Sequence, residues 1–483
     1  MAHFDGDNGG ATHRGVTGDE VRILVYFNGC CGQVTSRGME DVPFDEIHDL
    51  GIPSDDPDEF VYDRMLRAYQ RWFNARFQTY GRFVHYWVHY SAFEPTNTSA
   101  AYSPELRRAD AARGIDEVDP YAVVTFAGEN NDAYIEAVAS QGVVVLHGLL
   151  SGISSTGFPA AFLATHPGRI WSYIPSIEQR ARLVTSYVCQ KVVPHPVSFS
   201  GNGDIGAPRQ LGIIRSVDPR FADRVLYGEL LKAGVEECGG VFVDEVGYNG
   251  NVGTNVTNNS DVAAGMASFQ QRGVTTVLIA VTSAANDPPP SKSAAQIGYV
   301  PEWIVAGDYV AERPLQSRLQ DQDEWEHARA VTNYPVVLDV ERQQCVDAYR
   351  EVDADEPTFQ VKNYACEFYP SLQQLFTGIQ VAGPNLSPDT MDQGFHAIPS
   401  IRSDDPRMPA CFYDPGDYTC VKDAVAEWWD PAGVTPGSSQ PGCMRVMEGG
   451  RRYLAGSWPD GDVEAQRGTA ATDPCTAQGP DAA

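Results

Sequence analysis

Two short apolar stretches on either side of one helical segment set the strongest limit on how this chain can fold. The segment from Glu117 to Ile153 reads EVDPYAVVTFAGENNDAYIEAVASQGVVVLHGLLSGI. The runs YAVVTF and VVVLH are β-branched and apolar on both faces, as buried parallel strands are. DAYIEAVASQG between them has helical spacing and ends at a glycine, which completes a βαβ unit. In such units the loops at the carboxyl ends of the strands line the ligand crevice, so the candidate ligand-facing positions are Ala127, Gly128, Glu129 and Gly148 to Ser151.

The same alternation of strands and helices occurs twice along the chain, once from about residue 20 to 175 and again from about 176 to 310. Two α/β repeats of this size predict two lobes, each with a mostly parallel sheet and right-handed crossovers. In the last third, EWEHARAV is predicted to be helical and AVAEWWDPAGV to end another helix. The predicted boundaries are 1–18 for a disordered leader, 19–175 for the first part of lobe 1, 176–310 for the first part of lobe 2, 311–410 for a return to lobe 1, 411–457 for a return to lobe 2 and the hinge, and 458–483 for an extended, partly disordered tail.

Charge and hydropathy exclude several classes of partner. The chain of 483 residues carries 64 acidic and 35 Lys and Arg side chains, and its formal charge of -29 repels phosphate backbones and anionic lipid alike. Nucleic acid is therefore not an expected partner. No apolar run approaches the roughly 20 residues that span a bilayer. The N-terminus MAHFDGDNGG has no signal-peptide core, so an exported form of the protein would have lost its signal before residue 1.

The ten cysteines indicate disulfides and an oxidising, extracytoplasmic compartment. Their number is even, none belongs to a C-x-x-C pair, and six lie in the loop-rich region from Cys345 to Cys475. Zinc is the weaker interpretation, because no ligand spacing supports it. The adjacent Cys30 and Cys31 could bridge to separate partners or to each other, and both alternatives remain open.

The order of elements along the chain resembles a known family. It is carried by GVTGDEVRILVYFNG near the start, AVVTF and VVVLHG, the segment RIWSYIPSIEQRARLVTSYV, and then LGIIRS and VFVDEVGY. Each motif is weak alone, but their order from about Gly15 to Val310 resembles the type I periplasmic binding proteins. These are the branched-chain amino acid binding proteins of ABC importers, and the resemblance is greatest to divergent actinobacterial members.

The resemblance implies a fold and a function. The fold is α/β, with two lobes joined by three crossover strands that close on a small ligand like a hinge. The function is that of an extracytoplasmic solute-binding protein, a monomer without metal or cofactor. It would capture a small polar or amphipathic molecule, such as an amino acid or amide, for a membrane permease. By position, the implied ligand-binding residues are Asn28, Gly29, Ala127, Gly128, His147, Ser151, Tyr173, Tyr248, Thr282 and Ser283.

Three departures from the family pattern affect the expected ligand. Relatives have a short loop after the first strand, and here it is replaced by the Cys30-Cys31 pair and a Pro- and Asp-rich insertion up to Glu59. The PPPSK run at residues 288–292 lies near the second-lobe site. No clear acidic residue stands where the amino acid binders hold an amino group, and Glu129 and Asp308 are the alternatives for that role. An ordinary branched-chain amino acid is therefore not the expected ligand.

A hydrolase or other enzyme that uses the cleft is the main alternative, and a ligand-sensing receptor domain is the third. HGLLSGISS lacks the G-x-S-x-G pattern of a nucleophile elbow. Asp244 and Glu245 are adjacent in a strand, so their carboxylates point to opposite faces. His85 and His89 share a face but lie roughly 13 Å apart along it, too far for one metal. Trp428 and Trp429 are expected to anchor the tail rather than to stack on a sugar.

Overall fold

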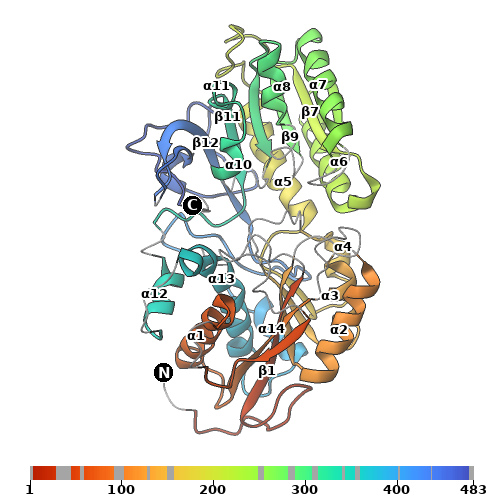
Figure 1. Cartoon of the computed structure of the whole chain (residues 1–483), viewed down its shortest axis with the longest axis vertical. Helices are drawn as coiled ribbons and strands as arrows, with labels where there is room; N and C mark the ends of the chain where they lie inside the picture. Colours follow the sequence, from red (N-terminus) through yellow and green to blue (C-terminus); the bar gives the residue numbers. More distant parts are fainter. Residues whose placement is uncertain are drawn as a thin grey trace.

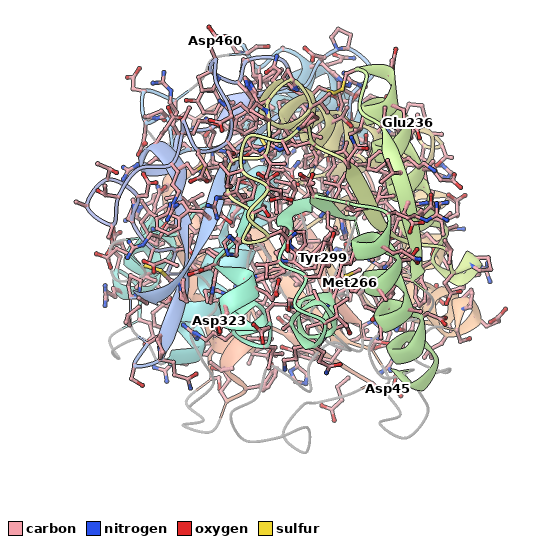
Figure 2. The ribbon with its side chains drawn as sticks, turned by 90° about the horizontal axis from the view of Figure 1, so that it is seen from above. Asp45, Glu236, Met266, Tyr299, Asp323 and Asp460 are labelled. Atoms are coloured by element: carbon pink, nitrogen blue, oxygen red, sulfur yellow. A yellow bond between two sulfur atoms is a disulfide. The ribbon has the colours of Figure 1, made fainter. Side chains whose placement is uncertain are left out.

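The computed structural model describes residues 4–28, 45–54, 59–91, 103–127, 131–148, 157–248, 255–280, 289–306, 314–339, 343–353, 359–400, 403–436 and 438–477. These residues form two α/β lobes, which lie one above the other in Figure 1 with the chain crossing between them. The predicted fold class is confirmed. Seen from above, Asp460 and Glu236 lie near the edge of the molecule, whereas the buried residues Met266 and Tyr299 lie near the middle of the view (Figure 2).

The first sheet has six strands, and its central strands coincide with apolar runs in the sequence. The order is β2 (Glu46–Asp49), β3 (Phe83–Tyr90), β1 (Glu20–Asn28), β4 (Ala122–Ala127), β5 (Val144–His147) and β6 (Ile170–Ser172). All pairs are parallel except the edge strand β2, which runs antiparallel to β3. Helices cover both faces of the central strands, so these strands are apolar throughout. The helices that pack in this lobe are α1 (Val61–Arg76), α2 (Pro104–Val118), α3 (Asp132–Ala139), α4 (Ala160–Leu163), α12 (Gln344–Arg350), α13 (Phe359–Ala382) and α14 (Pro388–His396).

The second sheet has a parallel half and an antiparallel half. Its main path is β13 (Pro441–Val446), β12 (Asp423–Val434), β11 (Ala328–Thr332), β10 (Glu302–Ala306), β9 (Thr276–Ala280), β7 (Leu211–Ser216) and β8 (Phe242–Tyr248), and β14 (Tyr453–Leu454) pairs with β12. Successive residues alternate between two cores, since Leu278 packs into one and Val277 and Ile279 into the other. The helices of this lobe are α5 (Ile177–Tyr187), α6 (Ala222–Glu237), α7 (Asn255–Gln271), α8 (Pro290–Gln296), α10 (Pro314–Arg318) and α11 (Gln322–Trp325).

Three segments connect the lobes: residues 173–176 lead from β6 to α5, residues 333–339 lead from β11 towards α12, and residues 411–422 lead into β12. The first and third lie side by side, because Ser172 pairs in parallel with Thr419 and the Val421 N–H donates to the Tyr173 carbonyl at 3.1 Å. Asp423 and Arg452 form a fully buried ion pair at 2.8 Å beside them. The two parallel strand ends that lead into crossings, β6 and β11, therefore both face the space between the lobes.

The prediction of a disordered leader is wrong for the described residues 4–18. Val16 is 2% exposed, and the Thr12 hydroxyl donates to the Leu386 carbonyl at 2.6 Å. Arg82 donates to the carbonyl of Thr17 at 2.7 Å. The glycine-rich, polar composition of this segment suggested disorder. Its hydrogen bonds to the first lobe offset the conformational entropy that is lost when the segment becomes ordered.

The C-terminal third also differs from its predicted organisation. AVAEWWDPAGV is part of strand β12, and in EWEHARAV only a short helical turn precedes strand β11. Because β11 pairs with β10 in the second sheet, the chain returns to the first lobe after residue 332, later than the predicted residue 311. Trp428 and Trp429 enter different cores, as neighbouring residues of a strand do. The pairing of β12 with β11, which is distant in sequence, overrides the local helical propensity.

The described part of the predicted tail, residues 458–477, packs on the second lobe. Val463 and Ala477 are fully buried, so a disordered tail is wrong there. The Trp428 indole donates to Asp473 at 3.0 Å, as expected for an anchor, whereas Trp429 is a fully buried core residue.

Disulfides occur in both lobes, as the cysteine count predicts. They join Cys189 to Cys238, Cys411 to Cys420 and Cys443 to Cys475, and Cys345 is also disulfide-bonded. Cys443–Cys475 ties the C-terminal segment to β13, and Cys411–Cys420 closes a loop within the third crossing. Cys30 and Cys31 lie outside the described residues.

His48, on the edge strand β2, is expected to make the protein less stable at high pH. His48 contacts the Asp63 carboxylate through Nδ1 and Glu46 through Nε2 at 3.0 Å. Two carboxylate partners favour the imidazolium, and the bond to Asp63 raises the pKa of His48 to about 9. Because the folded pKa exceeds the ordinary value of 6.5, the contribution is complete below pH 6.5 and is lost as the pH rises to 9.

We expect urea unfolding at pH 6 and pH 9 to show a His48-dependent loss of about 2–3 kcal/mol. The variant His48→Gln should lack that part of the pH dependence. His166→Gln, which removes an imidazole of similar exposure in the same lobe, should keep it. An unchanged pH profile in His48→Gln would contradict the assignment.

Candidate functional site

The carboxyl edge of the first sheet brings several predicted ligand-binding positions together. Asn28 and Ala127 are register partners at the ends of β1 and β4, and His147 ends the neighbouring strand β5. The predicted residues Gly29, Gly128, Ser151, Thr282 and Ser283 lie outside the described residues. Parallel strands therefore place the described first-lobe positions along one edge, as the βαβ pattern predicts.

His147 is the best-defined polar side chain at this edge. It is 1% exposed, its Nδ1 lies 3.1 Å from the Thr125 hydroxyl, and its ring packs edge-on against Phe158 at 4.8 Å. Burial lowers the pKa of His147 to about 4, so the imidazole is neutral at physiological pH. Its Nε2 atom has no hydrogen-bond partner among the described residues. A neutral imidazole in this state can make one hydrogen bond to a ligand without adding a charge.

Two buried polar side chains that sequence reasoning missed lie in this region. Asn131 precedes α3, is 1% exposed, and neither its amide oxygen nor its amide nitrogen has a partner within the described chain. Ser371 on α13 is fully buried, and its hydroxyl likewise has no partner there. A Cβ at Gly148 would lie 2.9 Å from the Ser371 Oγ, so this serine sits directly beside the end of β5. Asn131 resembles an ordinary helix cap in sequence, and Ser371 is more than 200 residues from β5, so neither gave a signal.

His147 and Tyr173 lie on opposite faces of the first sheet. His147 shares its face with Thr125, whose hydroxyl it contacts. Trp171 is the register partner of Leu146 and packs against Phe395 of α14 at 4.5 Å. Since side chains alternate along an extended chain, Tyr173 lies on the face of Trp171. The two predicted ligand residues therefore do not meet at one point.

Tyr173 instead lines a cavity of about 510 Å³ beside the crossings, which we call the hinge cavity. The first crossing contributes Tyr173, the second contributes residues 335–339, and residues 405–409 precede the third. The first lobe closes the cavity with α12, its preceding residue Gln343, and α13. The complete lining is Tyr173, Pro335, Val336, Val337, Leu338, Asp339, Gln343, Gln344, Cys345, Tyr369, Pro370, Gln373, Asp405, Arg407, Met408 and Pro409.

In the second lobe, Tyr248 is placed as a core residue. It ends the edge strand β8, is 3% exposed, and packs in the same core as Val246, Val262 and Met266. A ring that only faced a ligand cleft would be more exposed than this. The Tyr248 ring therefore contributes to the core of the second lobe.

The two carboxylates considered for catalysis have polar partners, and so does His85, one of the two imidazoles considered for metal binding. Glu245 pairs with Lys232 at 2.7 Å on α6, whereas Asp244 accepts from Ser268 at 2.6 Å on α7. The pair thus points to opposite faces, as the strand geometry predicts. His85 lies between Glu20 at 2.7 Å and Asp49 at 2.5 Å. Within the described residues, no group of three or more His, Cys, Asp or Glu side chains could hold a metal ion.

No helix in the described parts of the chain is both long enough and apolar enough to cross a bilayer. No protein-family model matches the sequence, and no curated protein sequence matches it.

Solved structures match the fold over nearly their whole length. An ABC transporter substrate-binding protein from Aeropyrum pernix is 11% identical, with a TM-score of 0.56 over 90% of this chain and 96% of that chain. A solute-binding protein from R. palustris in complex with 4-hydroxybenzoate is 11% identical, with a TM-score of 0.55 over 92% and 98%. A substrate-binding protein from Desulfitobacterium hafniense in complex with Leu is 15% identical, with a TM-score of 0.51 over 90% and 100%. The chain therefore has the two-lobed type I fold of ABC transporter substrate-binding proteins.

Proposed function

We propose that this protein is an extracytoplasmic solute-binding protein, which captures a small polar or amphipathic molecule between its lobes and delivers it to the permease of an ABC importer. The observation that carries the proposal is the arrangement of the crossings. Two of them leave from the carboxyl ends of β6 and β11, so both sheets turn their ligand-binding edges towards the space that hinge motion opens and closes. The disulfide between Cys189 and Cys238 in the second lobe and the disulfide-bonded Cys345 in the first support an oxidising compartment.

The proposed site lies at the facing strand ends. In the first lobe it comprises Asn28, Gly29, Ala127, Gly128, His147 and Ser151, and we add Asn131 because its buried side-chain amide has no partner among the described residues. In the second lobe it comprises Tyr248, Thr282 and Ser283. Backbone amides and neutral side chains can hold a carboxylate or an amide, and lobe closure removes water from both. The matched proteins bound to Leu and to 4-hydroxybenzoate support ligands of this size.

Binding, rather than chemistry, is the proposed activity. Capture and release need only a hinge and a complementary surface, and the proteins of the same fold described above are substrate-binding proteins. We propose that the protein acts as a monomer, without a cofactor, and that it is not an enzyme. Recovery of a chemically altered ligand would instead indicate an enzyme.

A thermal-shift screen tests this proposal. The purified protein should be warmed with amino acids, amides, short peptides, sugars and aromatic acids, and the bound compound recovered and identified. A ligand at about 100 times its Kd stabilises the folded state by roughly 2.7 kcal/mol, which is readily measured. We expect one chemical class to raise the Tm and to be recovered unchanged. The absence of a shift with every class would contradict the proposal.

His147→Phe tests the first-lobe site. Phenylalanine keeps a buried ring but removes Nε2, so we expect the Kd for the ligand found in the screen to rise about tenfold, because one buried hydrogen bond is lost. Isothermal titration measures the change. His166→Phe is the control, since its imidazole pairs with Glu136 near the surface of the same lobe. Equal affinities for His147→Phe and the wild type would exclude His147 from the site.

A further inference from the structure

The hinge cavity has the size and surroundings of a small-molecule site. Its volume of about 510 Å³ lies within the usual range for ligand pockets. Gln373 lines it from α13 and follows Tyr369 by four positions and Pro370 by three, so these lining residues share one face of the helix. The second crossing and residues 405–409 supply further walls. A molecule in the cavity would therefore contact the first lobe and the crossing region at once.

The hinge cavity is separate from the proposed strand-end site. Tyr173 lines the cavity and lies on the opposite face of the first sheet from His147, whose Nδ1 contacts the Thr125 hydroxyl. A molecule in the hinge cavity would therefore leave free the face that His147 shares with Thr125.

The charged side chains of the lining are already engaged, which favours an uncharged ligand. They are Asp339, Asp405 and Arg407. Arg407 donates to the Asp405 carboxylate from Nε at 2.8 Å and from Nη2 at 2.6 Å. Asp339 also has an interaction within the protein. A charged end group would lose hydration in the cavity and would have to compete for a counter-charge that already has a partner.

Neutral polar groups of the lining, in contrast, are available to a ligand. Among the described residues, the side-chain amides of Gln343 and Gln373 and the hydroxyl of Tyr173 have no hydrogen-bond partner, and all three residues line the cavity. Burial raises the pKa of Tyr173 to about 12, so its hydroxyl is uncharged at physiological pH. A glutamine amide presents a donor and an acceptor side by side, and a primary carboxamide on a ligand can pair with both at once.

The rest of the lining offers apolar surface to the body of such a ligand. Val336, Val337 and Leu338 of the second crossing contribute to it, together with Met408. Met408 is 53% exposed, a high value for a large apolar side chain. A ligand that covers this surface gains the free energy of removing it from water.

We propose that the hinge cavity is a second solute site, which takes a small uncharged amphipathic amide. The aromatic or aliphatic body of the ligand packs against the second crossing and Met408, and its carboxamide pairs with the amides of Gln343 and Gln373. This site goes beyond the proposed strand-end function, because it uses different residues on the other face of the first sheet.

Three small molecules test the proposal, since they share a hydroxyphenyl body and differ in the charge of the end group. They are 4-hydroxyphenylacetamide, which is neutral, 4-hydroxyphenylacetate, which is an anion, and tyramine, which is a cation. We expect isothermal titration of the full chain to detect binding of the amide, and binding at least about tenfold weaker for the acid and the amine, because each must bury a charge.

Variants of the lining locate the bound amide. Gln373→Trp, which fills the cavity from α13, should abolish binding of 4-hydroxyphenylacetamide. The double variant Gln343→Leu, Gln373→Leu keeps apolar bulk and should weaken binding about tenfold, because hydrogen bonds to the ligand are lost. Gln393→Trp adds the same ring at an exposed position of α14 outside the lining and should bind as the wild type does.

His147→Phe separates this site from the strand-end site, and it should retain binding of 4-hydroxyphenylacetamide. The proposal is overturned if the amide does not bind, if either charged analogue binds equally well, or if Gln373→Trp or the double leucine variant binds as the wild type does. It is also overturned if His147→Phe abolishes binding. That last result would identify the amide as a strand-end ligand and would leave the solute-binding function intact.

Discussion

Arg452→Met is expected to lower the free energy of unfolding by about 3–5 kcal/mol, because it leaves the buried carboxylate of Asp423 without its cation. Both side chains are fully buried. Arg452 donates to the Asp423 carboxylate at 2.8 Å, to the Tyr334 carbonyl at 2.6 Å and to the Asn333 carbonyl at 2.7 Å. The guanidinium thus joins the second crossing to the start of β12, and its loss should loosen the hinge.

Urea unfolding followed by circular dichroism measures this loss. Arg451→Met is a matched control, since Arg451 is the neighbouring residue, is exposed, and lies 5.9 Å from the ring of Tyr453. It should change stability by no more than about 0.5 kcal/mol. Replacing Arg452 and Asp423 together by apolar residues should cost less than the sum of the two single changes, because no charge is then left buried. Equal stabilities of Arg452→Met and Arg451→Met would show that the ion pair does not stabilise the hinge.

The parts of the fold that could be predicted from sequence are those with local signals. Continuous apolar runs such as VRILVYF and AVVTF predict buried parallel strands, because a strand covered on both faces needs apolar residues at every position. The structure places both runs in the centre of the first sheet. The assignment of AVAEWWDPAGV to a helix was wrong because the strand period is visible only when Trp428 and Trp429 are known to enter different cores.

The candidate site was predictable only at strand ends. His147 was predicted because ligands of open α/β sheets bind at the carboxyl ends of the parallel strands, and His147 ends such a strand. The hinge cavity was not predictable, because residues from separate segments, such as Tyr173, Val337 and Met408, meet only after the crossings form. The separation of His147 from Tyr173 was likewise hidden, since it depends on the register of β5 and β6.

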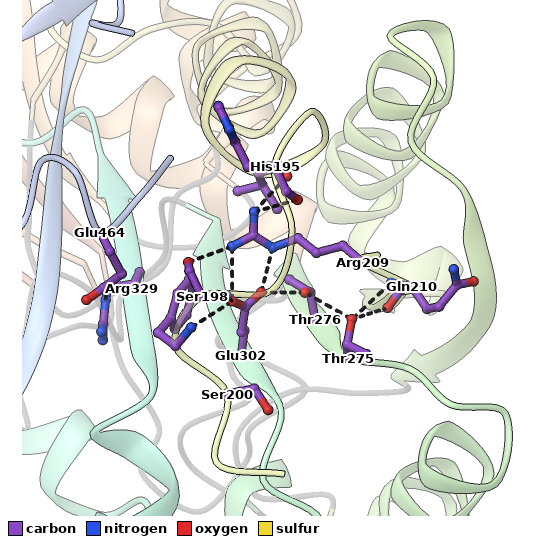
Figure 3. Close-up of polar contacts among 12 residues, drawn as sticks. His195, Ser198, Ser200, Arg209, Gln210, Thr275, Thr276, Glu302, Arg329 and Glu464 are labelled. Atoms are coloured by element: carbon purple, nitrogen blue, oxygen red, sulfur yellow. Dashed lines mark hydrogen bonds and ion pairs between the residues drawn. The ribbon is translucent and has the colours of Figure 1, made fainter. Parts of the chain in front are cut away.

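The second large loss of stability is expected from Glu302, at the end of the second sheet that lies away from the crossings. Glu302 is the first residue of β10, is fully buried, and accepts hydrogen bonds from the Ser198 N–H at 2.7 Å and the Thr276 hydroxyl at 2.6 Å (Figure 3). Arg209 donates to its carboxylate at 2.7 and 3.0 Å and also to the Val192 carbonyl at 2.8 Å. The carboxylate therefore ties the loop that precedes β7 to the amino ends of β9 and β10.

Glu302→Gln should lower the free energy of unfolding by about 3–5 kcal/mol, because the amide keeps the shape but leaves the guanidinium of Arg209 buried without a counter-charge. Urea unfolding gives the value, and Glu236→Gln on the exposed face of α6 is the control. Since Glu302 lies at the amino end of β10, away from the carboxyl ends that lead into the crossings, the folded variant should bind its ligand with wild-type affinity. A variant that retained wild-type stability would show that the hydrogen bonds alone hold this loop, whereas weakened binding in the folded variant would show that the far end of the sheet is coupled to the hinge.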